Sequence, residues 1–111
     1  KRLFDILAEN TVKDIFLQID TLWAVKGGVD VLEYCKKYKD RLDTLHFKDI
    51  SEEGKDTELG RGLIDFVSIL NVSDVIDWCI LEQEQFDMPK EKSIAISCAY
   101  LKGILDAKIA V

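Results

Sequence analysis

The stretch Phe16–Trp23, FLQIDTLW, is an apolar run that carries one carboxylate, Asp20. A buried parallel strand has a nearly continuous hydrophobic sequence, and residues Ile15–Ile19 have that character. Burying an unpaired carboxylate is unfavourable by several kcal/mol, so Asp20 does not belong inside such a strand. The predicted position of Asp20 is the C-terminal tip of the strand, where α/β proteins place their chemistry.

The same pattern recurs twice further along the chain. Residues Leu42–Phe47 contain the only histidine, His46, and the apolar run Ile76–Leu81 leads directly into Glu82. The intervals from Asp20 to His46 and from His46 to Glu82 are 26 and 36 residues, each close to the length of a βα unit. The sequence therefore predicts three successive strands with an acid, a histidine and an acid at matching positions.

Composition limits the classes of function. A chain of 111 residues forms one domain at most, and a net charge of −6 opposes binding to the phosphates of nucleic acids. No segment approaches the roughly 20 apolar residues of a membrane span, and no signal-peptide pattern opens the sequence. We therefore expect neither a nucleic acid nor a membrane as partner.

The cysteines and the first residue bear on the cellular context. Cys35, Cys79 and Cys98 are odd in number, lie in apolar surroundings and show no CxxC spacing. This pattern predicts reduced core residues of a cytoplasmic protein. Lys1 stands within a helical pattern without an initiator Met, which indicates an excerpt of a longer chain.

Capping residues mark the helices between the strands. Asp30 with Glu33 predicts an N-cap and its capping-box partner, and Asp65 predicts the cap of a short helix. A long C-terminal helix is expected after Asp87, with Pro89 in its first turn. Apolar residues at helical spacing include Leu3, Ile6 and Leu7 in a first helix, Val31, Leu32, Cys35 and Tyr38 in a second, and Ile94, Cys98, Leu101 and Leu105 in the last.

The expected order of elements is α-β-α-β-α-β-α. Strands that alternate with helices imply a parallel sheet, so the predicted fold class is α/β. A turn is expected at Gly27–Gly28, and a polar loop at residues 51–58 is expected to be the longest irregular stretch.

Asp20, His46 and Glu82 supply oxygen and nitrogen donors that suit Mn, Mg, Co or Zn. Neighbouring strand tips lie ~4.8 Å apart, so the three side chains are able to converge on one divalent ion. The alternative is that Asp20 caps a turn, His46 is a hydrogen-bonded core histidine and Glu82 is solvent-exposed. The residues alone leave both interpretations open.

Four segments carry a resemblance: LQIDTLWAVKGGVDVLEY (17–34), RLDTLHFKDI (41–50), GKDTELGRGLIDF (54–66) and ILEQEQFD (80–87). Their motifs, in this order and spacing, resemble the C-terminal part of the sugar phosphate isomerase/epimerase family, which has the xylose isomerase-like TIM barrel fold. The resemblance implies that residues 1–111 are the C-terminal portion of a single barrel domain and contain its last three strands.

The resemblance also implies a ligand set and a reaction. The family holds a divalent ion with Glu, Asp, His and Glu from four strand ends, of which Asp20, His46 and Glu82 would be the last three. The first Glu would lie before Lys1. The implied reaction on a small sugar is metal-assisted proton transfer next to a carbonyl, through an enediolate, with Glu82 as both ligand and catalytic acid or base.

Two further residues are candidates for binding substrate. Lys48 lies two residues after His46 on the same side of the strand, and it either reaches a substrate hydroxyl or phosphate or pairs with a nearby carboxylate. Trp23 either stacks on the apolar face of a sugar or is a core residue at the end of a strand. Asp49 points the other way and is expected to be structural.

The sequence departs from the ketose 3-epimerases of this superfamily. Those enzymes tend to carry a His where this chain has Trp23, and an Arg near the position of Glu52 and Glu53. The identity of the sugar, and whether it is phosphorylated, stays open. Glu84 is a rival to Glu82 as ligand, but Glu82 follows the apolar run directly, as in the family.

Two alternatives belong to other classes. A non-catalytic α/β regulatory module of the receiver type would need a Lys on its last strand, whereas Lys48 lies on the middle one. A barrel-type zinc endonuclease needs several histidines, and this chain has one. For the excerpt alone, we expect no catalysis, and we expect order only through the missing N-terminal part of the barrel or through self-association of edge strands.

Overall fold

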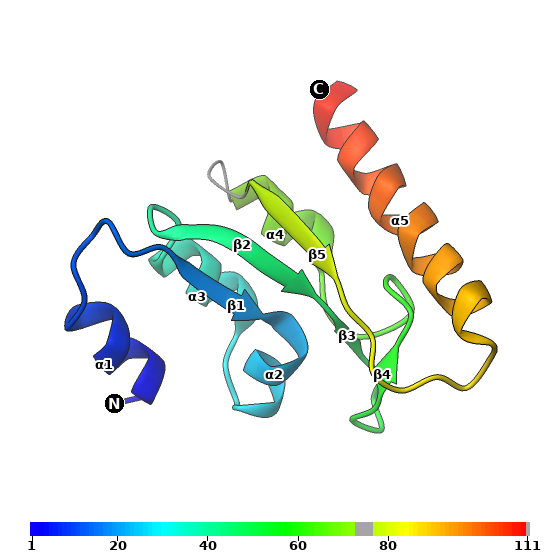
Figure 1. Cartoon of the computed structure of the whole chain (residues 1–111), viewed down its shortest axis with the longest axis horizontal. Coiled ribbons are helices and arrows are strands. Elements are labelled where there is room, and N and C mark those ends of the chain that lie inside the picture. Colours follow the sequence, from blue (N-terminus) through cyan, green and yellow to red (C-terminus); the bar gives the residue numbers. More distant parts are fainter. Residues whose placement is uncertain (73–76, 111) are drawn as a thin grey trace.

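The chain folds as a small parallel sheet with helices packed along it (Figure 1). The computed structural model describes residues 1–72 and 77–110. The elements are α1 (Leu3–Glu9), β1 (Leu17–Asp20), α2 (Thr21–Lys26), α3 (Val31–Lys37), β2 (Leu42–Phe47), β3 (Asp49–Ile50), β4 (Asp56–Thr57), α4 (Phe66–Val72), β5 (Trp78–Leu81) and α5 (Lys90–Ala110).

The three strands β1, β2 and β5 form one sheet in that order, and both pairs are parallel. This confirms the predicted α/β class and the parallel sheet, and β2 has the predicted bounds. Strand β1 begins later than expected, at Leu17, because Ile15 and Phe16 are about half exposed. Ile76, predicted to open the third strand, lies outside the described residues.

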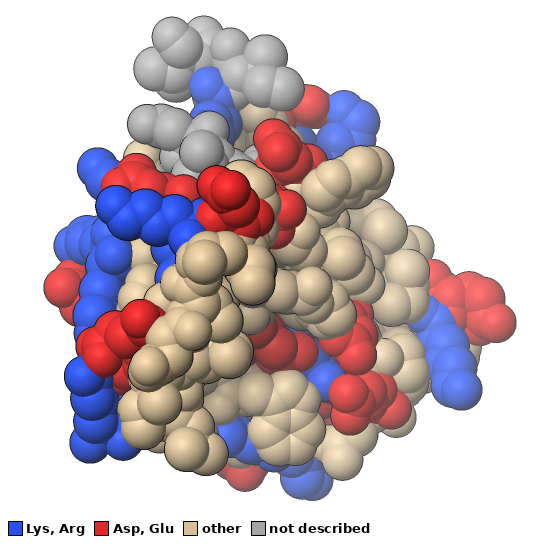
Figure 2. Space-filling model, turned by 60° about the vertical axis from the view of Figure 1, so that its left-hand side comes forward, with Lys and Arg blue, Asp and Glu red and all other residues tan. Residues whose placement is uncertain are grey.

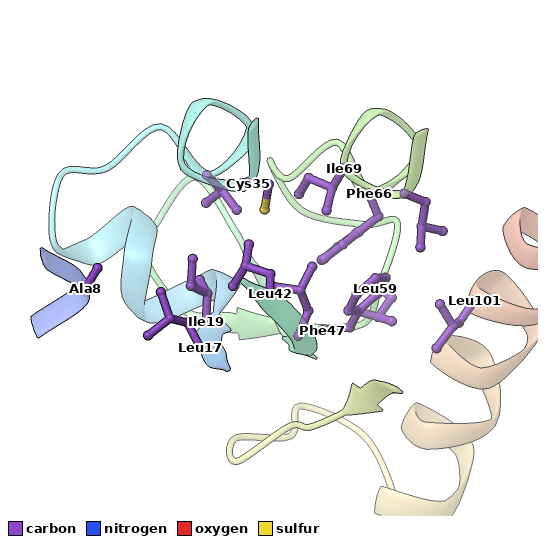
Figure 3. Packing of buried hydrophobic residues seen from close by; sticks show 13 residues of the cluster. Ala8, Leu17, Ile19, Cys35, Leu42, Phe47, Leu59, Phe66, Ile69 and Leu101 are labelled. Carbon is purple, nitrogen blue, oxygen red and sulfur yellow. The ribbon is translucent and has the colours of Figure 1, made fainter. Parts of the chain in front are cut away.

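One face of the sheet carries the core (Figure 3). The rings of Phe47 on β2 and Phe66 on α4 stack with their centroids 5.0 Å apart. Burial of such side chains contributes about 25 cal/mol per Å² of apolar surface, which makes this face the main source of stability. The cluster consists of Ala8, Leu17, Ile19, Val31, Cys35, Leu42, Leu45, Phe47, Leu59, Phe66, Ile69, Leu70 and Leu101.

The opposite face of the sheet is open. Trp78 and Ile80 on β5 are 68% and 41% exposed, and Gln18 on β1 is exposed as well. Because successive side chains of a strand point to opposite faces, His46 lies on this open face between the buried Leu45 and Phe47.

A helix that the sequence analysis did not predict, α2, follows β1 without a connecting loop. Asp20 ends the strand and caps the helix, because its Oδ1 accepts the backbone N–H of Trp23 at 3.0 Å. The predicted turn at Gly27–Gly28 is present: Gly27 is the C-cap of α2, and Gly28 has a φ of 76°. The predicted caps Asp30 and Asp65 also accept backbone N–H groups, as expected.

The predicted polar loop at residues 51–58 is partly wrong, because it contains strand β4 of an antiparallel hairpin. Strands β3 and β4 pair Asp49 with Thr57 and Ile50 with Asp56. Gly54, with a φ of 78°, lies in the connecting turn. The hairpin makes the loop a folded element beside the C-terminal ends of the main strands (Figure 1).

The buried face of α1 is not the apolar face, Leu3, Ile6 and Leu7, that the sequence pattern indicated. Leu3 and Leu7 are exposed, whereas Asp5 and Ala8 are buried. The carboxylate of Asp5 accepts hydrogen bonds from Tyr34 and Tyr38 on and beside α3 and from Lys37, and these bonds hold the pKa of Asp5 well below its usual range. A polar docking contact therefore decides the orientation of α1.

Helix α5 begins directly after Pro89. The residues on its buried side differ from those that the sequence predicted. Cys98 is exposed, so the expectation that it belongs to the core is wrong. Ser93 and Ser97 point inward instead: Ser93 donates to Glu58 at 2.6 Å, and the Ser97 hydroxyl accepts the Leu59 N–H at 3.0 Å. Cys35 is buried as expected, and Cys79 is half-buried.

Charge on the surface is mixed. On the face shown in Figure 2, Lys and Arg side chains along one edge alternate with Asp and Glu, and uncharged residues fill the middle. Within residues 1–72 and 77–110, none of the helices combines the length and apolar character that crossing a bilayer requires.

Candidate metal centre

Three polar side chains meet at the C-terminal end of the sheet. Asp20 is the last residue of β1, His46 lies opposite it on β2, and Glu82 directly follows β5. One donor atom from each lies within 4.8 Å of the other two. The predicted convergence of the three side chains is therefore confirmed, and their role as metal ligands stays a prediction.

The imidazole of His46 faces both carboxylates through one nitrogen. Its Nδ1 lies 2.5 Å from Glu82 Oε2 and 3.9 Å from Asp20 Oδ2. Burial raises the pKa of Asp20 and the Glu82 charge adds to this, although the Trp23 N–H, Lys48 and His46 act in the opposite direction. Bringing a cation to this point would relieve the repulsion between the two acids.

The donor set fits a divalent cation. Ligand atoms that share an ion at about 2.1 Å lie roughly 3 to 4 Å apart. The 3.9 Å between His46 Nδ1 and Asp20 Oδ2 is in this range, whereas Glu82 Oε2, at 2.5 Å from Nδ1, would have to move outward to share the ion. An imidazole nitrogen and two carboxylate oxygens suit Mn, Mg, Co or Zn. The three side chains are also accessible, because they remain between about a fifth and a third exposed.

Gln18 is a site residue that the sequence analysis missed. Its side-chain amide nitrogen contacts Nε2 of His46, on the side of the ring away from the carboxylates. The sequence contains a signal for it, because Gln18 is a polar residue in an apolar strand and lies two positions before Asp20, on the same face.

Lys48 lies beside the centre but is turned inward. Its side chain is 1% exposed, and Nζ lies 2.6 Å from Glu84 Oε1. Burial alone would lower the pKa of Lys48, but the contact with Glu84 and the carboxylates of Asp20 and Asp56 together raise it. Pairing with a carboxylate, one of the two predicted roles, is thus observed, and substrate binding by Lys48 stays a prediction.

Trp23 is not a core residue. It is 53% exposed on the first turn of α2, and its ring lies 5.0 Å from Lys26 Nζ and 5.6 Å from Lys48 Nζ. An exposed indole beside the three polar residues is available for stacking on a ligand, which stays a prediction for a sugar.

Glu84 and Glu82 occupy different environments. The Glu84 carboxylate pairs with Lys48, and this ion pair lowers the pKa of Glu84. The Glu84 N–H donates to Oδ2 of Asp56 at 2.6 Å, which fixes the segment after Glu82 against the β3–β4 hairpin. The geometry therefore favours Glu82 over its rival as the third donor. Asp56 is a second residue that the sequence analysis did not single out.

A cavity of about 570 Å³ opens next to the centre, between α1, β1 and α2. Its volume is in the range of small-molecule sites. The lining includes Phe4, Gln18, Asp20, Trp23 and Tyr34.

The sequence matches no protein-family model and no curated protein. Its structure is similar to two crystal structures of a sugar phosphate isomerase/epimerase from Parabacteroides distasonis, each with a TM-score of 0.75 and 24% sequence identity. The similar region covers 91% of this chain and 36% and 35% of those chains, so this chain spans about a third of their length. This similarity establishes that the observed arrangement of strands and helices also occurs in those proteins.

Proposed function

We propose that this chain is the C-terminal portion of a TIM-barrel isomerase or epimerase that acts on a sugar or sugar phosphate. The observation that carries the proposal is the convergence of Asp20, His46 and Glu82 at the C-terminal ends of three parallel strands. In barrel enzymes the chemistry sits at that end of the strands. The similarity to the sugar phosphate isomerase/epimerase structures supports the same proposal.

Asp20, His46 and Glu82 would hold a divalent cation, with a glutamate before Lys1 as the fourth ligand. Such a cation supplies a Lewis acid that polarises the carbonyl and hydroxyl oxygens of the sugar and stabilises an enediolate.

Glu82 would move the proton at the carbon next to the carbonyl, because a carboxylate within reach of that carbon serves as general base and then as general acid. Trp23, exposed beside the centre, would cover the apolar face of the sugar. Lys48 would meet a hydroxyl or phosphate oxygen by exchanging its contact with Glu84 for one with the substrate.

The open sheet face supports the proposal that further strands complete a barrel. Within the part of the chain that the structure describes, β1 and β5 each pair on one side only. The N-terminal part that the proposed barrel requires, or a second copy of this chain, would cover the exposed Trp78 and Ile80. A cytoplasmic location remains a prediction from the three cysteines, which are free.

The test is a Glu82→Gln substitution in the full polypeptide that carries these residues. With a sugar phosphate and Mn²⁺ in deuterated water, we expect exchange of the proton next to the carbonyl to fall by a factor of about 10² to 10⁴, the usual contribution of a general base. The amide keeps the shape of the side chain and one oxygen donor.

Glu84→Gln is the matched control, since it makes the same chemical change two residues away. We expect it to retain exchange at saturating sugar phosphate, because Glu84 contacts Lys48 and not His46. Normal exchange in Glu82→Gln together with loss in Glu84→Gln would transfer the catalytic role to Glu84. Absence of exchange in the unmodified protein with every sugar phosphate tried would contradict the proposed reaction.

A further inference from the structure

We infer that Gln18 is a positioning residue whose side-chain amide stabilises His46 in both its metal-free and its metal-bound form. The inference rests on the proposed metal site. The two nitrogens of the His46 ring contact different partners. Nδ1 lies 2.5 Å from Glu82 Oε2, and Nε2 contacts the side-chain amide nitrogen of Gln18.

These contacts fit one tautomer of the neutral ring. A neutral imidazole has one N–H donor and one bare nitrogen that accepts. In the tautomer that fits, Nδ1 carries the proton and donates to Glu82, because a carboxylate only accepts. Nε2 is then the acceptor, and the amide N–H of Gln18 donates to it. The observed network is self-consistent for a ring that holds no cation.

A cation bound at Nδ1 requires the opposite arrangement. Nδ1 must offer its lone pair, so its proton leaves to solvent and Nε2 takes a proton from solvent, with no net change in charge of the ring. The new Nε2–H then needs an acceptor. Gln18 supplies one by turning its amide over, which replaces the NH₂ group with the carbonyl oxygen.

Glutamine is suited to both forms, because its amide contains a donor and an acceptor at nearly the same place. A carboxylate at position 18 would serve only the metal-bound form, and an ammonium only the metal-free form. Gln18 is exposed and makes no other side-chain hydrogen bond within residues 1–72 and 77–110. Its contribution is therefore to the orientation and tautomer of His46 rather than to the fold.

The experiment compares Gln18→Met and Gln18→Glu in the full polypeptide. Binding of Mn²⁺ or Zn²⁺ alone is measured by calorimetry, and the tautomer of His46 is read from ¹⁵N chemical shifts of labelled histidine. Loss of the signal in His46→Asn identifies the residue. Zn²⁺ is used for the spectra because it is diamagnetic.

For Gln18→Met we expect Kd to rise about tenfold or more, as when other partners of metal-bound histidines are removed. In the metal-free spectrum of this variant, the share of the Nδ1–H tautomer should fall but not vanish, because Glu82 still accepts from Nδ1–H. Gln18→Glu should bind metal more tightly than Gln18→Met, and without metal it should raise the share of the Nε2–H tautomer relative to the unmodified protein. Gln85→Met, the same change at an exposed glutamine, should leave both readouts as in the unmodified protein.

Two different results would contradict the inference, and only one of them would also contradict the proposed function. Unchanged affinity and unchanged ¹⁵N shifts in Gln18→Met and Gln18→Glu, with an unmodified protein that binds metal, would overturn the inference and leave the proposed function standing. An unmodified protein that binds neither Mn²⁺ nor Zn²⁺ would overturn both.

Discussion

Asp49 and Lys48 are adjacent buried charges that the protein stabilises in different ways. Asp49 is fully buried and accepts backbone N–H groups from Ile50, Gly60, Gly62 and Ile64 at 2.9 to 3.2 Å. Burial raises the pKa of Asp49, and these four bonds oppose that rise. Lys48 instead has a single carboxylate partner. Asp49 therefore organises the loop at residues 60–64. Lys48 could exchange its contact with Glu84 for another partner.

We predict that Asp49→Ala destabilises the fold by about 3 to 5 kcal/mol, because it leaves several buried N–H groups without acceptors. Denaturant unfolding of the full polypeptide measures the change, with Asp14→Ala at an exposed site as control. A loss below 1 kcal/mol, about the value of one ordinary hydrogen bond, would show that water replaces the carboxylate.

Gly62 belongs to the same contact, since a Cβ there would lie 2.3 Å from Asp49 Oδ1.

At the scale of elements, α1 docks on α3 through polar groups. Asp5 receives hydrogen bonds from Tyr38, Lys37 and Tyr34, while Phe4 packs with its centroid 5.4 Å from that of Tyr38. The hydrogen bonds from Tyr38 and Lys37 are the main reason that the pKa of Asp5 is lowered. Protonation of Asp5 would remove the acceptor on which this contact depends.

The lowered pKa predicts how the contact depends on pH. A carboxylate whose pKa is depressed in the folded state contributes stability that is complete above its unfolded pKa of about 3.9 and lost as pH falls through the folded value. We therefore expect α1 to detach progressively below about pH 4. Asp5→Asn should detach it more readily at neutral pH and remove the acid dependence. Near-ultraviolet circular dichroism of the tyrosines follows the change, and equal acid transitions in both proteins would contradict the assignment.

The elements that sequence reasoning predicted correctly have local signals. Strand β2 contains the apolar residues Leu42, Leu45 and Phe47, which are buried. Asp30 caps α3 by accepting the backbone N–H of Glu33. The hairpin β3–β4 was not predicted, because its strands have only two residues each and mixed polarity, too short to show the alternation of apolar and polar residues that marks a strand. Helix α2 was missed because it starts inside the strand-like run, directly after Asp20, without a turn between them.

The candidate site divides in the same way. Asp20 and Glu82 are recognisable because each follows an apolar run, and His46 because it is the only histidine and lies near the end of the second predicted strand. The ends of neighbouring strands coincide in a parallel sheet. Asp56 is not recognisable in this way, because it lies on the β3–β4 hairpin. Its carboxylate contacts the site only by accepting backbone N–H groups of Glu84 and Gln85, in the segment after Glu82. Contacts of that kind depend on tertiary structure and leave no spacing in the sequence.

For the whole molecule, the asymmetry of the sheet is the dominant feature. The described residues measure 42 × 34 × 19 Å, a flat shape in keeping with one covered and one open face of the sheet. Apolar side chains on the open face, Trp78 and Ile80, and beside it, Phe16, are between 41% and 68% exposed. Exposed apolar residues next to unpaired strand edges are a template for association with another chain.

We predict that the isolated 111-residue chain self-associates through this face and its edge strands. Covering a few hundred Å² of apolar surface contributes about 25 cal/mol per Å², which is large against the marginal stability of a small domain. Analytical sedimentation should show dimers or larger species. Trp78→Lys should shift them toward monomer, because burying the added charge in the interface is unfavourable, whereas Ala99→Lys on the exposed side of α5 should not.

The isolated chain should also be unable to catalyse. Asp20, His46 and Glu82 provide three donors, and the proposed fourth ligand and the opposite wall of the site would come from the rest of a barrel. Supplying in trans the strands that the proposed barrel requires should therefore both reverse the self-association and give turnover. A compact monomer with cooperative unfolding would contradict the association, and sugar isomerisation by that monomer would show that the three residues suffice.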